Sequence, residues 1–176
     1  MTSLVNWFLI WWLRSGRYPW SRFRRKYFEF FWRNTALPSV TSLDDVLNRL
    51  GDVKWTRDKF LHLWDSVSYP QTVWRSKKDD CDGFAVLAAA LLRQSQPDSA
   101  PVLVTAMLRP VKYSHTVCAF QAPEGGLWFF DNYYLRQGNY HTYDDIVEVV
   151  RGDHELICWD VADPVKLATM EFHAVV

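Results

Sequence analysis

Residues 81–94 form a stretch that is apolar on nearly every side until Arg93, with the run Phe84-Ala-Val-Leu-Ala-Ala-Ala-Leu-Leu92 at its centre. We interpret this stretch as a helix. A helix without a polar face cannot lie on the surface of a folded domain, because each of its sides needs an apolar neighbour. The fold must therefore place this helix at its centre and cover it with other elements.

A candidate nucleophile lies where the polar segment Lys77-Lys-Asp-Asp-Cys-Asp-Gly83 gives way to this helix. The sulfur of Cys81 would lie at the positive end of the helix dipole, which favours thiolate over thiol. Asp79, Asp80 and Asp82 surround it. These carboxylates suit either a cap at the helix N-terminus or a cation such as calcium, and capping is the simpler interpretation.

Helical patterns dominate the first half of the chain and strand patterns the second half. Helices are predicted at about 43–50, with a capping box from Ser42 to Asp45, at 56–66, and at 142–150. The chain is then expected to loop from Tyr69-Pro70 toward Cys81. Strands are predicted at 102–108, 116–121, 127–130 and 156–161, the second and third of them joined as a hairpin. This order predicts an α+β domain in which the central helix packs against an antiparallel sheet.

The N-terminal segment has a composition of its own. Residues 1–34 carry seven basic residues against Glu29 alone, and 12 of the 29 aromatic residues. Ser15-Gly-Arg-Tyr-Pro19 divides the segment into two helix-compatible arms, which predicts a helical hairpin. We therefore expect a basic aromatic hairpin over 1–36, packed on a catalytic domain over 37–176.

Four uses of residues 1–34 are open. Their aromatic face can simply pack on the core, or it can dock on a membrane surface, where Trp, Phe and Arg are typical of interfacial helices. Single-stranded nucleic acid is a third option, because aromatic rings stack on bases beside arginines. A protein partner is the fourth.

Size and cysteine usage indicate the class of protein. A chain of 176 residues suits one domain with a substantial core. Three cysteines without CxxC spacing favour a reducing compartment. The apolar run Leu4 to Leu13 is too short to span a bilayer and lacks the features of a signal peptide, so we expect a cytoplasmic protein.

Two further residues complete a catalytic hypothesis. His115 lies near the start of one predicted strand and Asp131 at the end of another, so both can meet Cys81 at one end of the helix. Cys81 would be the nucleophile, His115 its base, and Asp131 the group that orients the imidazole. The backbone N–H of Cys81 could stabilise an oxyanion, with Gln71 and Trp74 as further oxyanion or substrate candidates.

The motifs Asp80-Cys-Asp-Gly-Phe-Ala85, Ser114-His-Thr-Val117 and Phe130-Asp-Asn132 together resemble the transglutaminase-like superfamily, and within it the bacterial transglutaminase-like cysteine peptidases. The resemblance covers about residues 55–160. It implies a papain-like helix-plus-sheet core and the roles given above. The family usually has Gly at position 79 and often an acid at 83, where this chain has Asp79 and Gly83. The missing acid argues against the calcium site of some relatives, and no metal or cofactor is expected.

The sequence therefore predicts a thiol-dependent peptidase, amidase or acyltransferase that forms an acyl-enzyme on Cys81, with a protein or peptide as substrate. Hydrolysis and acyl transfer share that intermediate. The alternative is a non-catalytic module that uses its basic aromatic N-terminal segment to hold a protein, a membrane surface or nucleic acid. Oligomeric state does not follow from the sequence.

Overall fold

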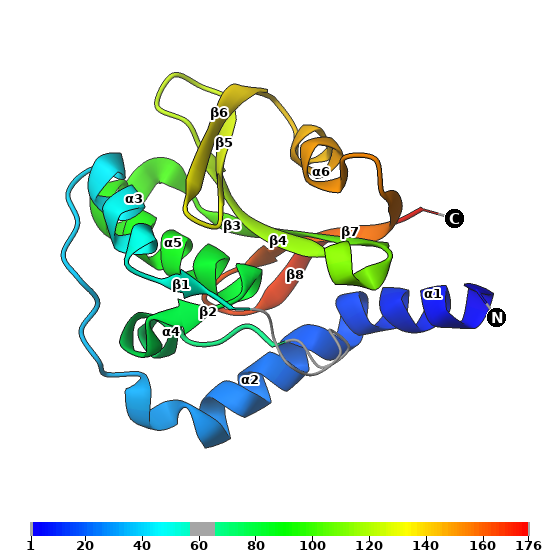
Figure 1. Ribbon diagram of the computed structural model, residues 1–176, viewed down its shortest axis with the longest axis horizontal. Helices are drawn as coiled ribbons and strands as arrows, with labels where there is room; N and C mark the ends of the chain where they lie inside the picture. Colours follow the sequence, from blue (N-terminus) through cyan, green and yellow to red (C-terminus); the bar gives the residue numbers. More distant parts are fainter. Residues whose placement is uncertain (1, 57–65, 176) are drawn as a thin grey trace.

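The computed structural model describes residues 2–56 and 66–175 and has the expected α+β architecture, with helices on both faces of an antiparallel sheet (Figure 1). The helices are α1 (Thr2–Trp11), the π-helical turn η1 (Trp12–Gly16), α2 (Arg17–Phe28), η2 (Phe30–Trp32), α3 (Leu43–Gly51), α4 (Pro70–Ser76), α5 (Cys81–Ser95), η4 (Pro97–Ser99), η5 (Val111–Tyr113) and α6 (Tyr143–Arg151). The strands are β1 (Lys54–Trp55), β2 (Lys78–Asp79), β3 (Val102–Arg109), β4 (His115–Gln121), β5 (Leu127–Asp131), β6 (Tyr134–Tyr140), β7 (Glu155–Asp163) and β8 (Ala168–Ala174). The described strands β3 to β8 form one sheet in the order β6-β5-β4-β3-β7-β8, and β1 pairs with β2.

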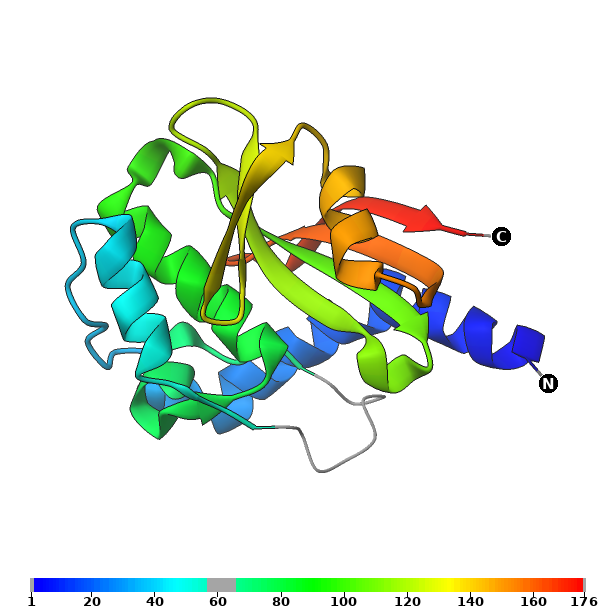
Figure 2. The ribbon, with the colours of Figure 1, turned by 45° about the horizontal axis from the view of Figure 1, so that its top comes forward.

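The main sheet is buried on both faces at its centre. Alternate residues of β3 point to opposite sides, as strand geometry requires. Leu103 packs in the same apolar cluster as α5, whereas Val104 packs with Ile146 and Val147 of α6. The two helices therefore cover opposite faces of the sheet (Figure 2).

The central position of α5 is confirmed. Residues 82–89 and 91–92 of this helix are buried. Strands β3, β4 and β5 contact it on one side, and α3 and α4 contact it elsewhere. Full enclosure explains why the helix has no polar stripe.

Local signals located the helix ends well. Both α3 and α6 begin with complete capping boxes, Ser42 with Asp45 and Thr142 with Asp145. The loop expected after Tyr69 is wrong, because Pro70 begins the helix α4. Proline is tolerated at the first helical position, where no N–H is needed. The helix predicted at 56–66 falls almost wholly outside the described residues.

Four of the described strands were not foreseen: the short pair β1 and β2, and the two edges of the main sheet, β6 and β8. Strand β6 is rich in polar and exposed residues, and β8 is exposed along most of its length. Neither has the apolar alternation of a half-buried strand. Each is held by hydrogen bonding to the strand directly before it in the chain, β6 to β5 and β8 to β7, as the second arm of a short hairpin.

The N-terminal hairpin prediction is wrong. Helices α1 and α2 run on through the π-helical turn η1 as one bent helix along the edge of the molecule (Figure 1). Gly16 keeps a right-handed helical backbone, with φ −97° and ψ −49°, and the Arg17 N–H bonds to the Trp12 carbonyl five residues earlier. The Ser15–Pro19 segment therefore widens the helix without reversing the chain.

The π turn keeps one side of this long helix against the protein. Buried residues recur at four-residue steps, at Leu9, Leu13, Arg17, Ser21 and Arg25. In a regular α-helix each such step gains about 40° beyond a full turn, so the buried side would rotate away. The wider turn at 12–16 offsets part of that drift.

The segment thus packs directly on the sheet. Leu9 and Leu13 share an apolar cluster with Met107, Ile157 and Cys158. Among the described residues, no helix is both long enough and apolar enough to cross a membrane. None of the three cysteines is in a disulfide.

Candidate active site

Cys81 is the first residue of α5, as the sequence predicted. Asp80 is its N-cap, and the Asp80 side chain accepts a hydrogen bond of 3.2 Å from the Asp82 N–H. Cys81 is partly exposed, whereas Cys118 and Cys158 are buried. Burial raises the pKa of the Cys158 thiol to about 12 and that of the Cys118 thiol even further, so both are held as inert thiols.

His115 and Asp131 form the second half of the site. His115 begins β4, Asp131 ends β5, and these strands pair directly. The Nε2 atom of His115 lies 2.8 Å from Oδ1 of Asp131. Arg136 of the edge strand β6 approaches the other carboxylate oxygen, with Nη2 at 3.4 Å from Oδ2. Burial opposes ionisation of Asp131, but the hydrogen bond and charge of His115 and the charge of Arg136 prevail and lower its pKa.

Cys81 and His115 line the same cavity, which has a volume of about 20 Å³. A space of this size holds roughly one water-sized group. Its walls come from the start of α5, from β3 and β4, from the segment before β4, and from η1 and α2. The other lining residues are Trp12, Arg17, Thr105, Met107, Val111, Ser114 and Thr116. The structure therefore places Cys81 and His115 on the same cavity, and it bonds His115 to Asp131.

The two weaker candidates lie elsewhere. Gln71 lines a separate, mostly apolar pocket of about 320 Å³ between α4, α5 and the β7–β8 turn. Trp74 packs against the core cluster around α5, with the Lys77 ammonium over its ring. Neither is among the residues that line the cavity of Cys81 and His115.

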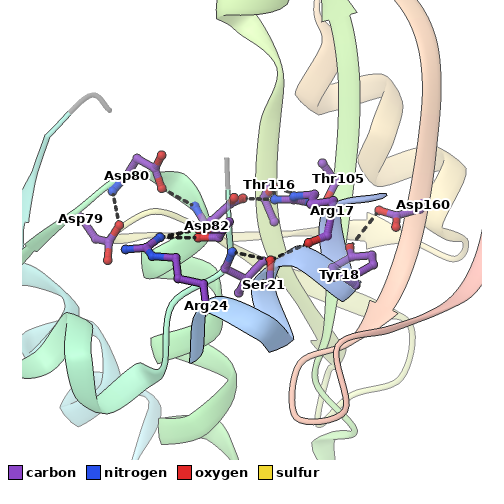
Figure 3. A network of polar contacts seen from close by, with 12 residues as sticks. Arg17, Tyr18, Ser21, Arg24, Asp79, Asp80, Asp82, Thr105, Thr116 and Asp160 are labelled. Atoms are coloured by element: carbon purple, nitrogen blue, oxygen red, sulfur yellow. Dashed lines mark hydrogen bonds and ion pairs between the residues drawn. The ribbon is translucent and has the colours of Figure 1, made fainter. Parts of the chain in front are cut away.

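Arg17 is a site residue that the sequence did not suggest (Figure 3). Its side chain is 3 % exposed and forms an ion pair with Asp82, the residue after Cys81, whose side chain is 1 % exposed. It also donates hydrogen bonds to Oγ1 of Thr105 at 2.8 Å and of Thr116 at 3.1 Å. A guanidinium from the N-terminal helix is therefore fixed at the cavity that Cys81 lines, held by α5 and two sheet strands.

A second buried carboxylate lies on the other side of Arg17. Asp160 of β7 is fully buried, and the Tyr18 hydroxyl donates a hydrogen bond of 3.3 Å to it. Burial raises the pKa of Asp160 to about 7, although the nearby Arg17 charge acts in the opposite direction. Burial and the Asp160 charge likewise raise the pKa of Tyr18. Of these two groups, Asp160 is the one whose pKa lies near neutral pH.

Glycine at position 83 has a steric reason. A Cβ atom at position 83 would overlap the carboxyl group of Asp79, which lies directly over it. Asp79 in turn accepts a hydrogen bond of 2.9 Å from the Asp80 N–H. Asp79 and Asp80 thus bind the backbone at the helix start, as the capping interpretation predicts, whereas Asp82 pairs with Arg17. In residues 2–56 and 66–175, no group of three or more His, Cys, Asp or Glu side chains is arranged to hold a metal ion.

Comparison of the chain with protein-family models and with curated proteins gives no significant match.

Proposed function

We propose that this chain is a cysteine hydrolase or amide acyltransferase with a papain-like, transglutaminase-like core. The observation that carries the proposal is the 2.8 Å contact between His115 and Asp131, combined with the cavity that His115 shares with Cys81. A base oriented by a carboxylate beside a thiol at a helix N-terminus is the arrangement that thiol-dependent acyl transfer requires. The resemblance of the three sequence motifs supports the same chemistry.

In the proposed mechanism the Cys81 proton passes to His115, and the sulfur attacks the carbonyl carbon of an amide. The C–N bond then breaks, and His115 returns the proton to the leaving amine. The product is a thioester on Cys81. Water or a second amine attacks this thioester, His115 removes the incoming proton, and the C–S bond breaks to release an acid or a new amide. Asp131 stabilises the imidazolium form of His115 at both stages.

The thioester is the direct test of this proposal. The 176-residue chain is incubated with a peptide mixture, quenched in acid and mapped by mass spectrometry. We expect an acyl adduct on Cys81 that hydroxylamine removes and that Cys81→Ala lacks. Adding an excess of a primary amine then separates the two reactions, because a transferase makes conjugates and a hydrolase releases free acid.

Alkylation supplies a second test that needs no substrate. Iodoacetamide should label Cys81 before Cys118 and Cys158, and His115→Asn should slow the labelling of Cys81 at least tenfold near neutral pH, since the base has gone. His141→Asn, at an exposed histidine elsewhere, is the matched control and should label like the unmodified protein. Equal rates in His115→Asn and the unmodified protein would contradict the triad and favour the non-catalytic alternative.

A further inference from the structure

Helix α1 is mostly apolar, with Asn6 bonded to Arg109, yet the protein covers only part of it. Its sequence, TSLVNWFLIW, contains no charged residue. Leu9 packs into the sheet, but the exposed side chains include Leu4, Val5, Trp7, Phe8 and Trp11. The helix extends past the sheet at the edge of the molecule in both views (Figures 1 and 2). A contiguous apolar surface of this kind marks an interaction site.

Beyond the exposed Ser15 and Pro19, exposed aromatic side chains recur on the outer side of α2. Four exposed aromatic residues each lie two positions before a buried residue. The pairs are Trp7 with Leu9, Trp11 with Leu13, Phe23 with Arg25, and Tyr27 with Glu29. Two positions correspond to about 200° around a helix, so the four aromatic side chains point away from the protein. We call these four residues, with their exposed neighbours Phe8, Phe28, Phe30 and Phe31, the aromatic row.

The exposed charged residues of the N-terminal segment, over positions 4–34, are all basic. Arg14, Arg22, Lys26 and Arg33 are exposed. Glu29, the one acidic residue in the first 34 positions of the sequence, is buried and paired with Arg24, and it also accepts a hydrogen bond from the Tyr69 N–H. A partner for this surface must therefore be anionic and must also accept apolar side chains.

We propose that the aromatic row docks on the surface of an anionic lipid bilayer, with α1 and α2 lying in the plane of the interface. Helices that combine aromatic residues with basic flanks bind in this way, and Trp and Tyr favour the headgroup region. A groove that tracks a phosphate backbone is the usual platform for single-stranded nucleic acid, whereas this row lies on the outer side of a helix. A second copy of the chain would bring like charges together. The proposal does not depend on the enzymatic one.

Vesicle binding tests the proposal with the 176-residue chain. Sedimentation is measured with vesicles of phosphatidylcholine alone and of phosphatidylcholine mixed with phosphatidylglycerol. We expect binding to the mixed vesicles that weakens with added salt, and at least tenfold weaker binding for the pair Trp7→Ser and Trp11→Ser. Trp55→Ser is the matched control, because Trp55 is 46 % exposed, like Trp11 at 45 %, but lies on β1. It should bind like the unmodified protein.

Charge is tested separately. Arg14→Gln and Lys26→Gln should each weaken binding to the mixed vesicles roughly fivefold, the factor expected for one basic residue near an anionic surface. Because these side chains are exposed, both variants should fold, and circular dichroism verifies it. The proposal would be overturned if the protein failed to bind mixed vesicles at low salt, or if the double tryptophan variant bound them as well as the unmodified protein. It would also be overturned if the aromatic row instead bound a labelled single-stranded oligonucleotide or a second copy of the chain.

Discussion

Replacing Arg17 by methionine should remove the guanidinium that neutralises Asp82 inside the protein. Both side chains are almost fully buried, so solvent screens their attraction very little. Removing one partner of a buried ion pair costs about 3–5 kcal/mol, because the remaining charge stays buried without its counterion. The loss of the hydrogen bonds to Thr105 and Thr116 adds little, since these hydroxyls already bond to each other at 3.2 Å. We expect a loss of about 3–5 kcal/mol in the free energy of unfolding.

Urea unfolding followed by tryptophan fluorescence measures this loss near neutral pH. The double variant Arg17→Met, Asp82→Asn should be more stable than Arg17→Met alone, giving a coupling energy of at least about 2 kcal/mol in the double-mutant cycle. Arg49→Met is the matched control. Its partner Asp52 lies 3.8 Å away and both side chains are about half exposed, so the expected loss is below about 1 kcal/mol. Equal losses in Arg17→Met and Arg49→Met, or additive effects of the two buried substitutions, would refute the reasoning.

Three further predictions follow from the same site. The folded-state pKa of Asp160, about 7, lies above the ordinary aspartate value of about 3.9, so the native state loses stability as pH rises through this window. Asp160→Asn should flatten that slope, and urea midpoints that keep the slope in the variant would contradict the assignment. Asp131→Asn should lower the rate of acylation of Cys81 by about 10²-fold or more, whereas Arg136→Gln should change it only a few-fold, as single-turnover kinetics would measure. Gly83→Ala should force the Asp79 carboxyl group away and destabilise the start of α5 by about 1–3 kcal/mol. Thermal unfolding measures this loss. A midpoint equal to that of the unmodified protein would contradict the steric overlap between a Cβ atom at position 83 and Asp79.

The elements that the sequence predicted are those with a local cause. Helix α5 follows from a run of apolar residues and an aspartate cap, and α3 and α6 follow from capping boxes, all within a few residues of the ends they define. His115 and Asp131 were located because each lies at the end of an apolar strand, and the two strands are joined as a hairpin. Short-range patterns are sufficient for all of these.

The hairpin error shows where such patterns fail. Glycine and proline near Ser15 signal a chain break, but the same residues are compatible with a widened helical turn. Packing of Leu9 and Leu13 on the sheet stabilises the continuous helix, and that packing depends on residues 107, 157 and 158, far along the chain. Edge strands β6 and β8 escaped prediction for a different reason. Each pairs with the strand just before it, but its exposed, polar sequence lacks the apolar alternation by which a half-buried strand is recognised.

The sequence by itself determined that a buried helix begins at Cys81 and that a histidine and an aspartate could reach it. Only the tertiary structure decided that Arg17 completes the surroundings of this cysteine, because its partners Asp82, Thr105 and Thr116 are 65, 88 and 99 residues away. An arginine in a basic segment carries no local sign that it will be buried. Whether a charge enters the core depends on whether distant elements supply a carboxylate and hydroxyls to receive it, which is a property of the assembled fold.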